Sequence, residues 1–267
     1  MRTLKMFLLC CAFAASAMAE SASTTPTEQI QLIQRAVSGD FEALAALDTD
    51  EEASRWDLFL QGYALASSDR DQEAVEAWEQ AMGMGLHLAV KALASHHYER
   101  RNWMEAYAWA RLAMEVDAAL HDSNMDDLRG RWPLYTAVQA ADNLESEQHQ
   151  AADTLALERV NRYLQHLIST DDVGSEDRND VKDLEIVERT RPVFPRSMLE
   201  NGRPGWSYVQ FEIRPDGRVG EVAAVAASHD RFARAAVRAI RKWRFNVEVM
   251  DSVPATASQH IDFTLRR

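Results

Sequence analysis

The clearest alternation of apolar and polar residues lies in the last third of the chain. Val209, Phe211 and Ile213 alternate with polar neighbours, which predicts a strand with one buried face. Pro215-Asp216-Gly217 predicts a turn, because Pro presets φ and Gly accepts a positive φ without steric cost. The second apolar run, Val219 to Val225, follows at hairpin distance. The pattern therefore predicts a β-hairpin.

A helix and a last strand complete this module. The helix is expected from about Asp230, because four apolar residues recur at helical spacing: Phe232, Ala236, Ile240 and Trp243. In the last strand, apolar residues alternate with polar ones over His260, Ile261, Asp262, Phe263, Thr264 and Leu265. Together these elements predict a compact α+β module at the end of the chain.

The stretch from Ile30 to about Ile168 has a different pattern. Ala, Leu, Glu and Gln dominate it, its single proline is Pro133, and apolar residues recur at three and four. This periodicity predicts an all-helical region, with Leu144 to Leu167 as one long helix.

The helical region contains a weak internal repeat. Glu73-Ala74 and Glu105-Ala106 align at a separation of 32 residues, and the segments Gly39–Ala43 and Gly85–Ala89 form a second related pair. From Gly39 to Asp117 the chain resembles tetratricopeptide-like or Sel-like repeats, which are two-helix units that stack into a solenoid. An ordinary helical bundle is the alternative.

The first residues have the composition of an export signal. Arg2 and Lys5 precede an apolar core, Met6 to Ala15, and Ala17-Met18-Ala19 forms a cleavage site before Glu20. The apolar run is shorter than the roughly 20 residues that span a bilayer, so cleavage is favoured over an uncleaved anchor. The expected organisation is a signal peptide (1–19), a disordered lead-in (20–29), a helical-repeat domain (30–168), an acidic linker (169–188) and the terminal module (189–267).

The distribution of charge and the number of cysteines limit the classes of function that are compatible with the sequence. Residues 20–188 carry a net charge of −21 and residues 189–267 a net charge of +6, which indicates two regions with different electrostatic roles. Cys10 and Cys11, the only cysteines, both lie in the signal, so the mature chain has neither disulfides nor thiolate sites. The basic part is small, and we expect no nucleic-acid partner.

Four segments of the terminal module carry a family resemblance. They are Arg191–Pro195, Glu200-Asn201-Gly202, Arg214–Val219 and Ala235–Phe245. In their order and spacing they resemble the C-terminal domain of the TonB family. The resemblance implies two helices on a three-stranded antiparallel sheet and a place in the periplasm. It also implies capture of the TonB box, an extended peptide of an outer-membrane transporter, by strand addition.

The resemblance also suggests where a peptide would bind. The last strand, His260 to Leu265, is the candidate edge, and Phe194 and Pro195 are candidates for side-chain selection. An open edge also allows strand exchange into a homodimer. The family's tyrosine is Phe194 here, and the proline that often follows Trp-Arg-Phe is Asn246.

The architecture differs from that of an energy transducer, which has an uncleaved membrane helix and a Pro-rich spacer. We therefore expect a periplasmic, non-enzymatic interaction protein whose helical repeats hold a further, unidentified protein partner. The alternative is a transducer working with ExbB–ExbD, anchored by Met6 to Ala19. An envelope enzyme is the third hypothesis, although no nucleophile elbow or phosphate loop is present.

Two other groups of residues are candidates for a binding site. Arg231, Arg234, Arg238 and Arg241 share one helix face, which is either a solvated face or a docking stripe for an acidic partner or for the acidic helical region. His96 and His97 are adjacent on a helix, so they point about 100° apart and do not form a chelating pair. We expect no catalytic residues, no metal and no cofactor.

Overall fold

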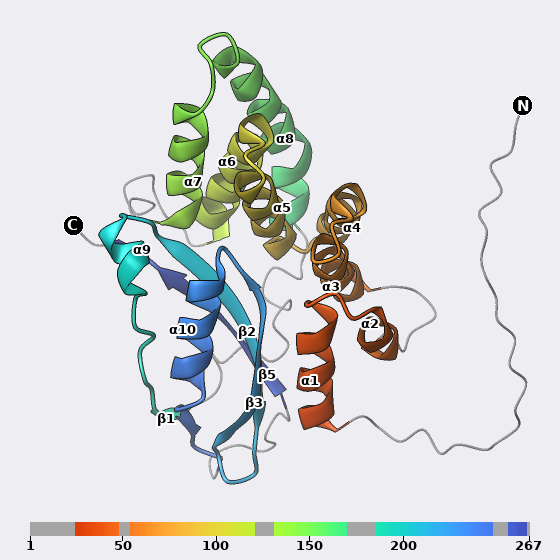
Figure 1. Ribbon diagram of the computed structural model, residues 1–267, viewed down its shortest axis with the longest axis vertical. Coiled ribbons are helices and arrows are strands. Elements are labelled where there is room, and N and C mark those ends of the chain that lie inside the picture. Colours follow the sequence, from red (N-terminus) through yellow and green to blue (C-terminus); the bar gives the residue numbers. More distant parts are fainter. Residues whose placement is uncertain (1–24, 48–53, 121–130, 170–184, 248–255, 266–267) are drawn as a thin grey trace, which may run out of the picture.

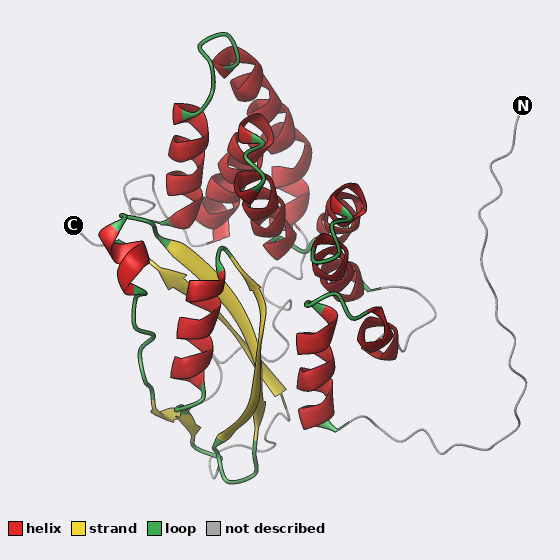
Figure 2. Cartoon of the chain, in the orientation of Figure 1, coloured by secondary structure: helices red, strands yellow, loops and turns green. Residues whose placement is uncertain are grey.

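The computed structural model describes residues 25–47, 54–120, 131–169, 185–247 and 256–265. Within these ranges, helices α1–α8 form the N-terminal region, and a small sheet with two helices follows (Figure 1). Figure 2 shows the strands gathered beside the helices of the first region. The expected α+β class, with an all-helical region followed by a three-stranded antiparallel sheet, is confirmed.

The helical region is built from short helices. They are α1 (Pro26–Ala36), α2 (Phe41–Leu47), α3 (Arg55–Ala66), α4 (Asp71–Gly83), α5 (Leu88–Glu99), α6 (Trp103–Leu120), α7 (Trp132–Asp142) and α8 (His149–Ser169). α1 packs on α2, α3 on α4 and α5 on α6, while α7 and α8 both pack on α6. The first six helices therefore form three successive pairs.

Four of the turns between these helices are closed by a residue with a positive φ. This residue is Gly39, Asp69 (φ 58°), Gly85 or Arg101 (φ 59°). In each turn, the N–H of the next residue donates to a carbonyl five residues back, as Asn102 does to His97 at 2.9 Å. This left-handed closure satisfies carbonyls at the end of the preceding helix. Two of the four turns use residues other than glycine, so glycine alone does not reveal them in the sequence.

The structure supports one of the two repeat alignments and not the other. Ala74 and Ala106 lie in the first turn of α4 and α6, the second helices of their pairs, and both are fully buried. They hold equivalent places. Gly39 joins the two helices of one pair, whereas Gly85 joins α4 to α5, between two pairs. The alignment of Gly39–Ala43 with Gly85–Ala89 was therefore wrong.

The ends of two helices differ from the expected ones. α1 begins at Pro26, inside the expected lead-in, because Thr25 and Glu28 form a capping box that starts the helix there. α8 begins at His149 rather than Leu144, after a turn in which the N–H of Glu145 donates to the Gln148 side chain at 3.0 Å. The export signal lies outside the described residues.

Within the described ranges, the C-terminal region contains two sheets and two helices. The main sheet has the antiparallel order β3-β2-β5, formed by β2 (Gly205–Ile213), β3 (Val219–Ala227) and β5 (Thr256–Phe263). β1 (Ile186–Glu188) pairs with β4 (Arg244–Phe245), and the helices are α9 (Arg196–Glu200) and α10 (Asp230–Ile240). β1 thus occupies the end of the expected linker, whose residues 170–184 lie outside the described ranges.

The predicted hairpin and amphipathic helix are confirmed. Gly217 has a φ of 76° in the β2–β3 turn, and a Cβ there would lie 2.2 Å from the carbonyl oxygen of Phe245. This turn therefore requires glycine. On α10, Phe232 and Ile240 are fully buried against the face of the sheet that carries Val209 and Phe211.

The opposite face of the sheet is covered by the helical region. Tyr208 stacks on Trp56 of α3, with ring centroids 5.4 Å apart, and Trp206 meets Trp132 of α7 at 6.0 Å. Trp206 and Tyr208 are 0% and 3% exposed. The expectation that β2 has one buried face was wrong, because its second face joins the core of the helical region. The sheet is a layer between α10 and the N-terminal helices (Figure 1).

Candidate functional site

The expected peptide-binding edge lies on the outer strand β5. Eight consecutive residues of β5, from Thr256 to Phe263, pair with β2 without a bulge. On its other side β5 has no strand partner among the described residues. The expected site residues 260–263 lie in β5, while Thr264 and Leu265 follow its end.

The backbone orientation along β5 follows from a hydrogen bond on β2. The N–H of Ser228 donates to the carbonyl of Trp206 at 3.1 Å, so the polar backbone groups of Trp206 point toward β3. Trp206 is opposite Asp262 on β5. The N–H and C=O of Asp262 therefore point away from β2, and by alternation those of His260 do too. An added strand would use groups with this orientation; the carbonyl of His260 also accepts from the side-chain amide of Gln259 at 2.6 Å.

Phe194 and Pro195 lie at the end of this edge. The Phe194 ring meets those of Phe263 and Phe232 edge-on, with centroids 5.8 and 5.7 Å away. Pro195 immediately precedes α9. The structure thus brings the expected selecting residues next to the last residue of β5.

A buried group of charges joins β5 to the helical region. Lys91 of α5 forms an ion pair of 3.1 Å with Asp117 of α6, and its Nζ lies 3.4 Å from Nε2 of His260. Burial, with help from Lys91, lowers the pKa of His260 to about 4. Burial alone would lower the pKa of Lys91, but Asp117 and Asp262 outweigh it and raise that pKa. His260 is therefore neutral and Lys91 charged near neutral pH.

The four arginines of the expected docking stripe lie exposed along α10. Arg231 donates to the hydroxyl of Ser197, and Arg234 lies 3.6 Å from Asp230. Arg238 and Arg241 form no ion pair with any residue that the structure describes. The helical region covers the other face of the sheet, and none of its described residues forms an ion pair with this stripe.

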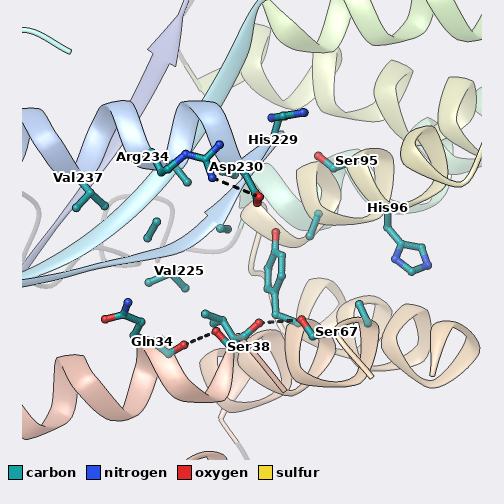
Figure 3. Close-up of a pocket in the computed structure, with 18 of the residues that line it drawn as sticks. Gln34, Ser38, Ser67, Ser95, His96, Val225, His229, Asp230, Arg234 and Val237 are labelled. Carbon is teal, nitrogen blue, oxygen red and sulfur yellow. Dashed lines mark hydrogen bonds and ion pairs between the residues drawn. The ribbon is translucent and has the colours of Figure 1, made fainter. Parts of the chain in front are cut away.

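A groove runs between α10 and α1, with the outer side of β3 as its floor. We call it the α1–α10 groove; its volume is about 790 Å³. Arg234, Arg238 and Arg241 line it from α10, and Gln34 and Ser38 line it from α1. Figure 3 shows Gln34 and Ser38 on one wall, with Arg234 and Val237 on the opposite wall.

The inner end of the groove contains two buried hydroxyls. Tyr63 and Ser95 line the groove, and their hydroxyl oxygens are shielded from solvent without a hydrogen-bond partner among the described residues. Ser95 is 8% exposed, and Figure 3 shows it on the same helix as His96. Burial raises the pKa of Tyr63, so its hydroxyl keeps its proton. No periodic pattern in the sequence identifies these residues, because the groove combines segments far apart in the chain.

Other polar residues near the groove and the sheet have structural roles. His229 caps α10, since its Nδ1 accepts from the N–H of Arg231 at 3.1 Å. The hydroxyl of Ser228 accepts from the N–H of Trp206 at 3.0 Å. Burial and Arg100 lower the pKa of His96 to about 4. Across the described ranges, no cluster of three or more His, Cys, Asp or Glu residues could hold a metal ion.

The comparisons with known proteins bear on the C-terminal region. The C-terminal region is a small α+β domain in which β5 is an outer strand with no second strand partner among the described residues. A model of the family described as "Gram-negative bacterial TonB protein C-terminal" matches residues 190–265. The curated proteins contain no match to the chain. None of the described helices is long and apolar enough to cross a bilayer.

Proposed function

We propose that this protein is a non-enzymatic interaction protein of the periplasm, in which the TonB-like domain binds an extended peptide along β5. The peptide class is the TonB box of an outer-membrane transporter. The observation that carries the proposal is the outer position of β5, which pairs regularly with β2 over eight residues and has no second strand partner among the described residues. The family match over residues 190–265 supports the same function.

The two edges of the sheet differ in a way that favours β5. β3 departs from regular pairing twice: Val225 is an extra residue, and Gly220 and Glu221 both lie opposite Glu212. The N–H of Glu221 donates to the Glu212 carboxylate at 3.1 Å, which fixes the second bulge. Bulges bend a strand and protect its edge from pairing, so a long peptide would find a regular template on β5 only.

Proline substitution at Asp262 tests the β5 edge. Asp262→Pro removes an N–H that points away from β2, so the sheet should remain folded while peptide binding weakens about fivefold or more. Asp262→Ala is the matched control, because it removes the same side chain but keeps the N–H. The measurement is calorimetric titration of the full chain with a synthetic TonB-box peptide. Equal affinities for the folded Pro and Ala variants would exclude β5.

The helical region serves as a scaffold in this proposal. Its three helix pairs, closed by left-handed turns, support an assignment to tetratricopeptide-like or Sel-like repeats. α3, α5 and α7 also hold the second face of the sheet through Trp56, Lys91 and Trp132. The scaffold thus orients the peptide-binding edge as well as offering a surface to a second protein.

The cellular location of the protein distinguishes the proposed periplasmic protein from a membrane-anchored energy transducer. Cleavage after Ala19 would release a chain that starts at Glu20, whereas a transducer coupled to ExbB–ExbD would retain Met6 to Ala19 as an anchor. Mass spectrometry of the protein from periplasmic and membrane fractions distinguishes them. An intact N-terminus in the membrane fraction would favour the transducer.

A further inference from the structure

We propose that the α1–α10 groove is a second peptide site, which takes an extended acidic segment of a partner protein. The groove borders β3, on the opposite edge of the main sheet from β5. Its walls come from both halves of the chain, since α1, α3 and α5 face α10 and β3 across it (Figure 3). The site therefore exists only where the two regions are packed together.

Charge determines the kind of ligand. Arg234, Arg238 and Arg241 face the groove from one side of α10, and the latter two have no ion-pair partner among the described residues. The carboxylates that also line the groove are Asp230, at the start of α10, and Glu99 of α5. Asp230 is about 12 Å from Arg238 along the helix axis, so the far end of the groove is basic.

The spacing of the arginines favours an extended chain over a single small anion. Four residues of α-helix rise about 6 Å, the separation of Arg234 and Arg238 along the axis. Alternate residues of an extended peptide are about 6.6 Å apart and point the same way. A peptide with acidic residues at alternate positions can thus place successive carboxylates against Arg234 and Arg238, with Arg241, the C-cap residue of α10, beyond them. A small anion reaches only part of this row.

The inner end of the groove offers neutral donors. Tyr63 and Ser95 line this end of the groove, and their hydroxyls lie buried behind its surface without a described partner. A buried hydroxyl without a partner is costly, which makes it a specific donor for an incoming acceptor. We assign these two hydroxyls to main-chain carbonyls of the peptide. The floor between the two ends is formed by small apolar residues of β3, such as Ala224 and Val225.

Binding here should differ physically from binding at β5. The bulge at Val225 limits regular backbone pairing along β3, so the affinity must come mainly from carboxylate–guanidinium contacts. Exposed charge contacts weaken as salt screens them. The acidic-peptide site is therefore strongly salt-dependent, whereas a backbone ladder at β5 is not.

The test uses two labelled hexapeptides, Glu-Val-Glu-Val-Glu-Val and Gln-Val-Gln-Val-Gln-Val, with the full-length protein. Fluorescence anisotropy at low salt should show the Glu peptide binding about tenfold more tightly than the Gln peptide, with the difference lost at high salt. Equal binding of the two peptides, or no binding of either at low salt, would overturn the proposal.

Substitutions of groove residues test whether the acidic peptide binds in the α1–α10 groove. Arg238→Gln combined with Arg241→Gln should weaken Glu-peptide binding about tenfold. The control, Arg196→Gln combined with Arg244→Gln, removes two exposed arginines outside the groove and should leave binding unchanged. Tyr63→Phe, which deletes one hydroxyl of the helical region, should weaken binding a few-fold without altering its salt dependence. Equal loss in the groove variant and the control variant would show that only net charge matters and would refute the site.

The β5 variant separates this proposal from the first one. Asp262→Pro should leave Glu-peptide binding intact, because Asp262 is on the other edge of the sheet. If Asp262→Pro abolished Glu-peptide binding while Arg238→Gln with Arg241→Gln did not, the acidic peptide would occupy β5 and the groove proposal would fail. Loss of TonB-box binding alone would leave the groove proposal standing.

Discussion

The two faces of the central sheet are both buried, but by different kinds of side chain. Toward α10, Phe211, Phe232 and Phe263 form an apolar layer. Toward the helical region, Trp206 and Tyr208 pack beside a buried ion pair, Lys91 and Asp117. The first face is stabilised by the burial of apolar surface, whereas the second also depends on two buried, opposite charges staying paired. The stability of the second face is therefore sensitive to pH and to the loss of a single partner.

The largest effect is expected from breaking the buried pair. Lys91→Met should lower the free energy of unfolding by about 3–5 kcal/mol, because it leaves the carboxylate of Asp117 buried without its cation. Combining it with Asp117→Leu should recover most of that loss, since two apolar side chains need no partner. Urea denaturation measures both. A loss below about 1 kcal/mol for the single variant would show that the pair does not hold this face.

An overpacking substitution probes the α10 face. A Cβ on Gly205 would lie 2.1 Å from the ring of Phe232, which is fully buried. Gly205→Ala should therefore cost about 2–3 kcal/mol, since a tightly packed ring must shift. This loss should be the same at pH 7.5 and pH 5, because the face contains no titrating group. A pH-dependent loss would contradict the division between the two faces.

The pH dependence of stability should come from the other face. The pKa of His260 is about 4 in the folded protein, below its ordinary value of 6.5. Between these values the unfolded chain binds more protons, so stability falls as the pH drops from about 6.5 toward 4. The groups around His260 are Lys91, Asp117, Asp262 and His87.

His260→Gln checks this assignment. Between pH 7.5 and pH 5 the parent should lose about 1–2 kcal/mol more stability than the variant, measured by denaturation at each pH. His96, whose pKa is also about 4, lies on α5, where it lines the α1–α10 groove. It contributes to the pH dependence of both proteins equally, so the difference reports His260. If the stability of the parent and of the variant changed with pH in the same way, His260 would not be the source of the pH dependence.

The smallest effect is expected outside both faces. Arg238→Gln with Arg241→Gln should change the free energy of unfolding by less than about 0.5 kcal/mol, because both side chains are exposed and neither is paired with a described residue. The same protein samples serve for the peptide measurements. A large loss of stability would mean that the stripe supports the fold rather than a ligand.

Much of the C-terminal region could be predicted from its pattern. The alternation around Phe211, the turn at Gly217 and the apolar stripe through Phe232 all predicted elements that the structure contains. These signals are local: each depends on residues within one strand, turn or helix. The left-handed turns at Asp69 and Arg101 escaped prediction, because residues other than glycine adopt that conformation rarely.

The contacts between the two regions had no such local signal. Lys91 and His260 meet although they are 169 residues apart in the chain. Trp, Tyr and His have an apolar body with a polar tip, so at alternate positions of a strand they suit either water or a second packed layer. The α1–α10 groove depends on the same packing, since Tyr63 and Arg238 come from opposite sides of it.

The sequence by itself determined the helices, the hairpin, the first buried face of the sheet and the arginines along α10. Only the tertiary structure decided that the helical region covers the second face, that Lys91 and Asp117 are buried beside β5, and that a basic groove runs along β3. The physical reason is that periodicity records which side of an element avoids water, whereas the element that covers that side is chosen by long-range packing.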